Sequence, residues 1–151
     1  MSAIWKPNVT VAAAIYRDGQ YLLVEEQTDE GVRFNQPAGH LECGENLLDA
    51  VVRETLEETA YHFKPTALLG VYNWRHEKKQ ITYLRFAFVG EIMGWEAERK
   101  LDEGIIAARW MTVEEARASR HLHRSPLILR CIEDHATGKR YPLDLLTHYD
   151  S

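Results

Sequence analysis

Three closely spaced glutamates are the residues of this chain best suited to chemistry. Glu54, Glu57 and Glu58 lie within five positions of one another, so on a helix their carboxylates share an arc of about 100°. Like charges at these spacings destabilise a helix, and a divalent cation, which prefers oxygen ligands, offsets the repulsion. The triplet therefore fits a metal site. Helical geometry alone also allows a solvated acidic face.

The wider pattern around the glutamates separates these two interpretations. Gly39 is followed after five residues by Glu45, and after seven more by Arg53-Glu-Thr-Leu-Glu-Glu58. This spacing resembles the signature sequence of the Nudix hydrolases. The resemblance identifies six positions as a Nudix box: Gly39, Glu45, Arg53, Glu54, Glu57 and Glu58.

Two positions of the box depart from the family pattern. Thr55 stands where the family has a bulky aliphatic residue, and Ala60 stands where it has glycine. Thr55 keeps a methyl group on the side expected to face the core, so we expect little effect. Glycine ends this helix in a left-handed conformation, so Ala60 either costs about 1 kcal/mol there or lets the helix run on slightly.

The resemblance covers the chain from about Lys6 to Leu145. Within the family, the chain is similar to the phosphatase NudJ branch. The segments that carry it are residues 34–42, 83–86, 109–110, 124–127 and 141–143. It implies an α+β fold, an α/β/α sandwich with a mixed sheet, in a single domain of residues 1–151. It also implies an enzyme that uses Mg²⁺, with Mn²⁺ as a possible substitute.

The activity implied by this branch is hydrolysis of phosphoanhydride bonds. Its substrates are nucleoside tri- and diphosphates and the pyrophosphates of thiamine and of its hydroxymethylpyrimidine precursor. Two alternatives stay open: a pyrophosphatase for ADP-ribose or an oxidised nucleotide, and a domain that binds a nucleotide without cutting it. The intact Arg-Glu-x-x-Glu-Glu set argues against the second. Whether phosphate or pyrophosphate is released is also open.

The resemblance also assigns roles to individual residues. Its metal ligands are Glu54, Glu57 and Glu58, with the carbonyl of Ala38 as an extra ligand. Arg53 is expected to hold one of these glutamates through a bidentate bond. Catalysis is assigned to the set Glu54, Glu57 and Arg53.

Two further roles are left with alternatives. Glu45 is expected to close the loop before the helix rather than to bind metal. The general base is either Glu54 or Glu57, or a carboxylate from a distant loop, for which Asp102 and Glu103 are the candidates.

Substrate binding is expected at four residues: Gly39, His40, Trp74 and Arg85. Trp74 and Tyr83 either stack on a flat base or pack within a hairpin. Positive charge for the phosphates is available from Arg75, Lys78, Lys79 and Arg85, although such a run is also typical of a solvated surface. Trp95 and Trp110 are assigned to packing.

Strands and turns must position these residues. Hydrophobic patterning predicts strands at residues 9–16, 21–25, 67–74, 81–91 and 105–111. A hairpin turn is expected at residues 17–20, where Asp18-Gly19 stands, and a polar loop at residues 28–33. The mixed order of strands and helices is typical of an α+β or three-layer domain.

Three helices complete the prediction. The first spans residues 46–59 with Asn46 as its N-cap, and its core side is expected to hold Leu48, Val52, Thr55, Leu56 and Thr59. The second opens at a capping box of Thr112 and Glu115. The third runs from Ser125-Pro126 to about Gly138.

The composition excludes several other classes of protein. The formal net charge of −5 argues against a nucleic-acid binder, and no apolar run approaches the roughly 20 residues needed to cross a membrane. The first residues lack the layout of a secretory signal, and Cys43 and Cys131 have no metal-type spacing. We therefore expect a cytoplasmic protein with a small nucleotide or diphosphate substrate, either monomer or homodimer.

Overall fold

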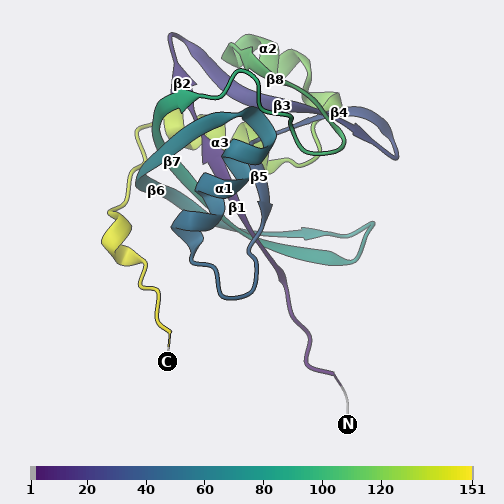
Figure 1. The fold of residues 1–151 in the computed structure, drawn as a ribbon. Helices are drawn as coiled ribbons and strands as arrows, with labels where there is room; N and C mark the ends of the chain where they lie inside the picture. Colours follow the sequence, from purple (N-terminus) through teal and green to yellow (C-terminus); the bar gives the residue numbers. More distant parts are fainter. Residues whose placement is uncertain (1–2, 151) are drawn as a thin grey trace.

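The computed structural model describes residues 3–150, whose strands form two sheets (Figure 1). The first sheet is mixed, with the order β5-β1-β7-β6, because β1 and β7 are parallel and the other neighbours are antiparallel. Its strands are β1 (Asn8–Ala14), β5 (Ala38–His40), β6 (Tyr61–His76) and β7 (Ile81–Trp95). The second is antiparallel and holds β2 (Tyr16–Arg17), β3 (Gln20–Thr28), β4 (Gly31–Asn35) and β8 (Ile105–Met111).

Two helices cover opposite faces of the mixed sheet, α1 (Leu47–Thr59) in front and α3 (Leu127–Ala136) behind in Figure 1. Successive strand residues point to opposite faces, so Phe88 of β7 packs in the α1 core while Ala87 packs against Cys131 of α3. The shorter elements are α2 (Val113–Ala118) and the 3₁₀ turns η1 (Arg120–Leu122) and η2 (Leu143–Leu145). The expected α+β class with a mixed sheet is confirmed. The division of the strands into two sheets was not anticipated.

The first hairpin turn is confirmed, and one loop is not. Asp18 and Gly19 both adopt positive φ angles (51° and 81°) between β2 and β3, which suits the twist of a two-residue hairpin. Residues 28–33 were expected as a loop, but β3 runs to Thr28 and pairs there with Gly31 of β4. The prediction was wrong because backbone pairing with β3 outweighs the polar composition of this stretch.

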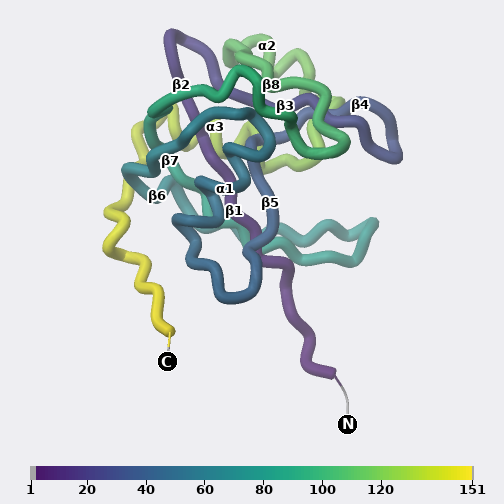
Figure 2. The backbone as a smooth tube through the Cα atoms, in the orientation of Figure 1, coloured from purple at the N-terminus to yellow at the C-terminus, as the bar shows by residue number. Residues whose placement is uncertain are grey.

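The strands β6 and β7 are longer than predicted. Their ladder pairs Tyr61 with Trp95 at one end and His76 with Ile81 at the other. The hairpin projects from the body of the molecule (Figure 2). Residues 74–76 and 81–83 are therefore held on the ladder, and residues 77–80 form the turn between them.

Local capping sets the ends of the helices. Asn46 caps α1 by accepting a hydrogen bond from the backbone N–H of Asp49 (2.8 Å), as predicted. Ala60 ends it at φ 66°, with its N–H bonded to the Leu56 carbonyl, so the helix does not run on. Thr112 and Glu115 form the predicted capping box of α2.

The buried face of α1 is rotated from the predicted one. Thr55 and Thr59 are buried and Leu48 packs against the core as expected, but Ala50 and Val51 are fully buried, whereas Val52 and Leu56 are only partly buried. This rotation turns the glutamate side of the helix toward β5. Thr55 was expected to be harmless, yet its buried Oγ1 has no hydrogen-bond partner within residues 3–150.

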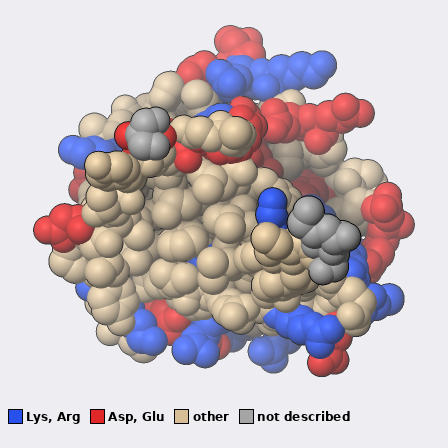
Figure 3. Space-filling model, turned by 90° about the horizontal axis from the view of Figure 1, so that it is seen from below, with Lys and Arg blue, Asp and Glu red and all other residues tan. Residues whose placement is uncertain are grey.

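The surface charge is unevenly distributed. Figure 3 shows charged side chains mainly around the rim of the face seen from below and uncharged side chains across its centre. No helix within residues 3–150 combines the length and the apolar character needed to cross a membrane.

Candidate active site

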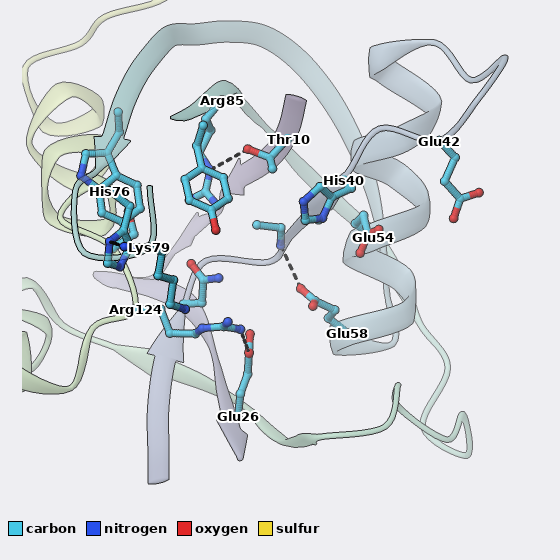
Figure 4. A pocket seen from close by; sticks show the side chains of 16 residues that line it. Thr10, Glu26, His40, Glu42, Glu54, Glu58, His76, Lys79, Arg85 and Arg124 are labelled. Atoms are coloured by element: carbon cyan, nitrogen blue, oxygen red, sulfur yellow. Dashed lines mark hydrogen bonds and ion pairs between the residues drawn. The ribbon is translucent and has the colours of Figure 1, made fainter. Parts of the chain in front are cut away.

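A cavity of about 360 Å³ lies where the mixed sheet meets α1 and the segment that precedes α3 (Figure 4). The register aligns His40 of β5, Thr10 of β1 and Arg85 of β7 in one row across the sheet. Paired residues in a row point to the same face, so all three line the cavity. Its other lining residues are Glu26, Asn35, Ala38, Gly39, Glu42, Glu54, Glu58, Trp74, His76, Lys79, Tyr83, Arg124 and Ser125.

The helix α1 brings two carboxylates to this cavity. The carboxyl group of Glu54 lies against Gly39, where a Cβ atom would come within 2.1 Å of Glu54 Cδ. Any side chain at position 39 would therefore displace Glu54. Glu58 Oε1 accepts a hydrogen bond from the backbone N–H of Ala38 (2.8 Å). The short strand β5 thus holds both acids in place.

Arg53 is bonded to three other residues of the box, but its bidentate partner is not the one expected. Its bidentate partner is Glu45, with Nε and Nη2 at 2.7 and 3.0 Å from the carboxylate. Its Nη1 donates to Glu54 at 2.7 Å and to Glu57 at 3.3 Å. Glu45 also accepts the backbone N–H of Glu42 (3.1 Å). The fork therefore fastens the loop before α1, and single bonds orient the neighbouring glutamates.

Burial shapes the electrostatics of the three glutamates. It raises the pKa of Glu58 to about 9, and it raises the pKa values of Glu54 and Glu57 from their ordinary range as well. A nearby cation would favour the charged forms. The cavity-facing carboxylates of Glu54 and Glu58 are donors that suit a hard divalent cation. Within residues 3–150, however, no three Asp, Glu, His or Cys side chains already form a complete metal site.

Arg85 supplies an unusual positive charge on the opposite wall. The residue is only 7% exposed, and its guanidinium donates to Thr10 Oγ1 (3.3 Å) and Gln36 Oε1 (3.2 Å). Burial lowers the pKa of Arg85. Among residues 3–150 no carboxylate forms an ion pair with it. A buried charge without a counter-ion is costly, so this wall is suited to an anionic ligand.

The β6–β7 hairpin adds aromatic rings next to Arg85. Trp74 and Tyr83 are cross-strand partners, and their rings stack at 5.4 Å between centroids and 19° between planes. Both residues also line the cavity. Trp74 and Tyr83 therefore pack against each other in the hairpin and also form an aromatic wall of the cavity.

The two loop candidates for the base differ in position. The backbone N–H of Asp102 donates to the Glu57 carbonyl (3.0 Å), and, besides burial, the negative charge of Asp102 contributes to the raised pKa of Glu57. Asp102 therefore lies beside α1, although neither it nor Glu103 lines the cavity.

Two further residues of the cavity were missed as site residues. Glu26 and Arg124 form an ion pair within it. Arg124 lies in residues 124–127, one of the segments that carried the family resemblance. Glu26 lies in β3, where no motif in the neighbouring sequence indicated a site residue.

Comparisons with known proteins agree with this fold and box. A family model described as the NUDIX domain matches residues 6–131. Phosphatase NudJ of Escherichia coli (strain K12) is 35% identical over 147 residues, which is 97% of this chain and 95% of that protein. A solved NUDIX hydrolase from Nitrosomonas europaea is 51% identical with a TM-score of 0.94, over 97% of this chain and 99% of that one. The chain therefore belongs to the Nudix hydrolase family.

A more distant structure shares the fold. A UDP-X diphosphatase superimposes with a TM-score of 0.74 at 20% identity, over 93% of this chain and 68% of that one. The architecture thus persists in proteins of divergent sequence.

Proposed function

We propose that the chain is a single Nudix domain that hydrolyses phosphoanhydride bonds with Mg²⁺. Its substrates are nucleoside tri- and diphosphates and small heteroaromatic pyrophosphates such as thiamine pyrophosphate. The observation that carries this proposal is the pairing of two walls in one cavity. Partly buried carboxylates on α1 face the buried Arg85, which has no carboxylate counter-ion within residues 3–150, and this arrangement suits a cation and a phosphate chain bound together.

In this proposal the acidic wall holds Mg²⁺, or Mn²⁺ in its place. The ligands are the carboxylates of Glu54, Glu57 and Glu58, with the carbonyl of Ala38. When bound there, the ion would supply positive charge to the phosphate oxygens and would lower the pKa of a water molecule. Arg53 keeps Glu54 in its position, so it contributes to catalysis without touching substrate.

The remaining residues bind and orient the substrate. Arg85 and His40 bind phosphate oxygens, and Gly39 leaves room for Glu54. Trp74 and Tyr83 stack on the ring of the substrate. Glu54 is the base that we favour, because its carboxylate faces the cavity from α1. Its Oε1 is bonded to Arg53, so Oε2 accepts the proton of the attacking water.

The size of the cavity favours these substrates over ADP-ribose. At about 360 Å³ it lies at the small end of the range for ligand pockets. A heteroaromatic group with at most one sugar and its phosphates suits this volume better than ADP-ribose, which has two sugars. The NudJ relative, a phosphatase by name, supports the same choice.

A substrate panel with purified protein and Mg²⁺ tests the proposal. It should contain nucleoside tri- and diphosphates, ADP-ribose, thiamine pyrophosphate and hydroxymethylpyrimidine pyrophosphate, with release of phosphate and pyrophosphate assayed separately. We expect turnover of the nucleoside tri- and diphosphates and of the two pyrophosphates. We also expect EDTA to abolish this turnover. Turnover that resists EDTA would exclude the metal assignment. Binding of a nucleotide without turnover would favour the non-catalytic alternative.

Metal binding can be measured without turnover. Mg²⁺ at ten times its Kd should stabilise the fold by about 1.4 kcal/mol, which raises the Tm by roughly 3–5 °C for a domain of this size. The same Mg²⁺ should not shift the Tm of Glu58→Gln. An equal shift in both proteins would place the ion elsewhere.

A further inference from the structure

An ion pair between two distant segments of the chain lines the same cavity as Arg85 and the acidic wall. Arg124 Nη1 donates to Glu26 Oε2, although the residues are 98 positions apart in the sequence (Figure 4). The side chain of Glu26 is 9% exposed and that of Arg124 is 41% exposed. The carboxylate is thus enclosed, while the guanidinium reaches the open part of the cavity.

The backbone on both sides of this pair is fixed. The N–H of Arg124 donates to the Phe34 carbonyl of β4 (2.9 Å), beside the bridge between Phe34 and His123. The next residue, Ser125, accepts the N–H of Leu127 at the start of α3 (3.0 Å). Arg124 therefore extends from a rigid junction between β4 and α3.

The strand β3 provides an internal comparison. Glu25 and Glu26 are consecutive, at the register shift of the β3–β8 ladder. Glu25 pairs with Arg109 (2.9 Å) and does not line the cavity, whereas Glu26 pairs with Arg124 inside it. Two similar ion pairs thus start from neighbouring residues of one strand, and only one faces the cavity.

Arg124 has hydrogen-bonding capacity left over. Within residues 3–150 its Nε and Nη2 groups make no hydrogen bond, and only Nη1 contacts Glu26. A guanidinium fork binds phosphate oxygens through parallel hydrogen bonds, and prior anchoring reduces the freedom it loses on binding. Arg124 lines the same cavity as Glu58 and Arg85, so it is within the space that a phosphate chain bound there would occupy.

We propose that Arg124 binds a non-bridging phosphate oxygen of the substrate and that Glu26 is the positioning residue that holds it there. This inference rests on the proposed function, because it requires a phosphate chain in the cavity. The pair adds a second arginine to the phosphate-binding wall formed by Arg85.

Steady-state kinetics with Mg²⁺ and the best substrate of the panel test this assignment. Loss of a charged hydrogen bond should raise the KM of Arg124→Ala by about 10- to 100-fold, with a smaller change in kcat. Arg124→Lys should lie between, because lysine keeps the charge without the fork. Glu26→Gln should raise KM by about three- to tenfold. It should have no further effect in the Arg124→Ala background, where there is no arginine to position.

Matched controls come from the neighbouring ion pair. Glu25→Gln and Arg109→Ala should leave both kinetic constants within about twofold of the wild type. A KM within twofold of wild type in Arg124→Ala would overturn the assignment. An undiminished effect of Glu26→Gln in the Arg124→Ala background would overturn the positioning role. If Arg124→Ala does not fold, Arg124→Lys and Glu26→Gln carry the same test.

Calorimetric binding of inorganic pyrophosphate with Mg²⁺ separates this inference from the proposed function. Its Kd should rise by about 10- to 100-fold in Arg124→Ala. Weaker binding in that variant, combined with a wild-type protein that hydrolyses none of the panel, would refute the proposed function and support the Arg124 assignment. Equal binding in both proteins, with an active wild type, would refute the assignment alone.

Discussion

Two helices flank the same sheet, and Asp134 on α3 and Glu58 on α1 both turn inward, but the surroundings of these two acids differ. Asp134 on α3 accepts a hydrogen bond from the Tyr72 hydroxyl (2.7 Å), and it pairs with Arg130 (3.2 Å) and Lys139 (3.3 Å). Glu58 on α1 accepts one hydrogen bond, from the backbone N–H of Ala38. The first acid is satisfied by the fold alone, and the second is not.

The pKa values of the two acids record this difference. Burial pushes the pKa of Asp134 upward, but the hydrogen bonds from its partners outweigh burial and hold it below its ordinary value. Burial raises the pKa of Glu58 to about 9, and the single Ala38 N–H opposes this only in part. Within residues 3–150 Glu58 has no Arg or Lys side chain as an ion-pair partner, so its carboxylate is available to a ligand in the cavity. The comparison therefore assigns Asp134 to the framework and Glu58 to the site.

The largest expected effect comes from removing the charge of Glu58. Glu58→Gln keeps the shape and the acceptor for Ala38 but removes a ligand of the proposed metal. We expect kcat to fall by at least about 1,000-fold, comparable to losing a main electrostatic contributor, while circular dichroism and the metal-free Tm at pH 5 stay near wild type. Activity within tenfold of wild type would remove Glu58 from the site.

The pH dependence of stability should separate the two acids next. In metal-free protein Glu58 stays protonated up to about pH 9, whereas in the unfolded chain it ionises near its ordinary value of 4.5. Its stabilising contribution is therefore complete below pH 4.5 and is lost as the pH rises toward 9. The slope is at most about 1.4 kcal/mol per pH unit.

Urea unfolding in EDTA at pH 5 and pH 8 measures this effect. Wild type should lose free energy of unfolding relative to Glu58→Gln between the two values. Asp134, with a lowered pKa, contributes stability above its ordinary value of 3.8 and loses it only at lower pH. The difference between wild type and Asp134→Asn should therefore stay constant from pH 5 to 8. A constant difference for Glu58→Gln would contradict the comparison.

The same contrast explains how far the sequence could predict the structure. The Asn46 cap and the Asp18-Gly19 turn depend on neighbours within a few residues, so they were predictable. The spacing from Gly39 to Glu58 also lies within one short stretch, and it marked the two acids that α1 brings to the cavity, Glu54 and Glu58. The rotation of α1 was not predictable, because it depends on β5 packing against the acidic side of the helix, which the sequence pattern did not indicate.

Contacts between distant segments were beyond the reach of local patterns. The Glu26–Arg124 pair joins residues 98 positions apart, and the burial of Arg85 depends on Gln36 and on the packing of α3. In a strand, an alternating pattern places Arg85 on one face without showing whether that face is covered. The sequence therefore indicated the positive charge of Arg85, but not that its side chain is buried without a carboxylate partner within residues 3–150.

A smaller effect is expected when the charge of Asp134 is removed. Asp134→Asn leaves Arg130 and Lys139 without a counter-ion, and because both are well exposed to solvent the loss should be about 1–2 kcal/mol in the free energy of unfolding. Exposed Glu133 on the same helix provides the control, since Glu133→Gln should change stability by less than about 0.5 kcal/mol. Both variants should keep the kcat/KM of wild type. A fall in kcat/KM for Asp134→Asn alone would place this acid in the function.

The smallest effect concerns two threonines of α1. Thr55 Oγ1 is buried without a partner within residues 3–150, whereas Thr59 Oγ1 donates to the Thr55 carbonyl (2.6 Å) and accepts the N–H of Tyr61 (3.1 Å). Valine has nearly the shape of threonine, so Thr55→Val should raise the free energy of unfolding by about 1 kcal/mol, and Thr59→Val should lower it by about 1–2 kcal/mol. Urea unfolding of both variants measures the pair. Equal destabilisation by both would show that the Thr55 hydroxyl has a partner, and that α1 satisfies its buried polar groups as fully as α3 does.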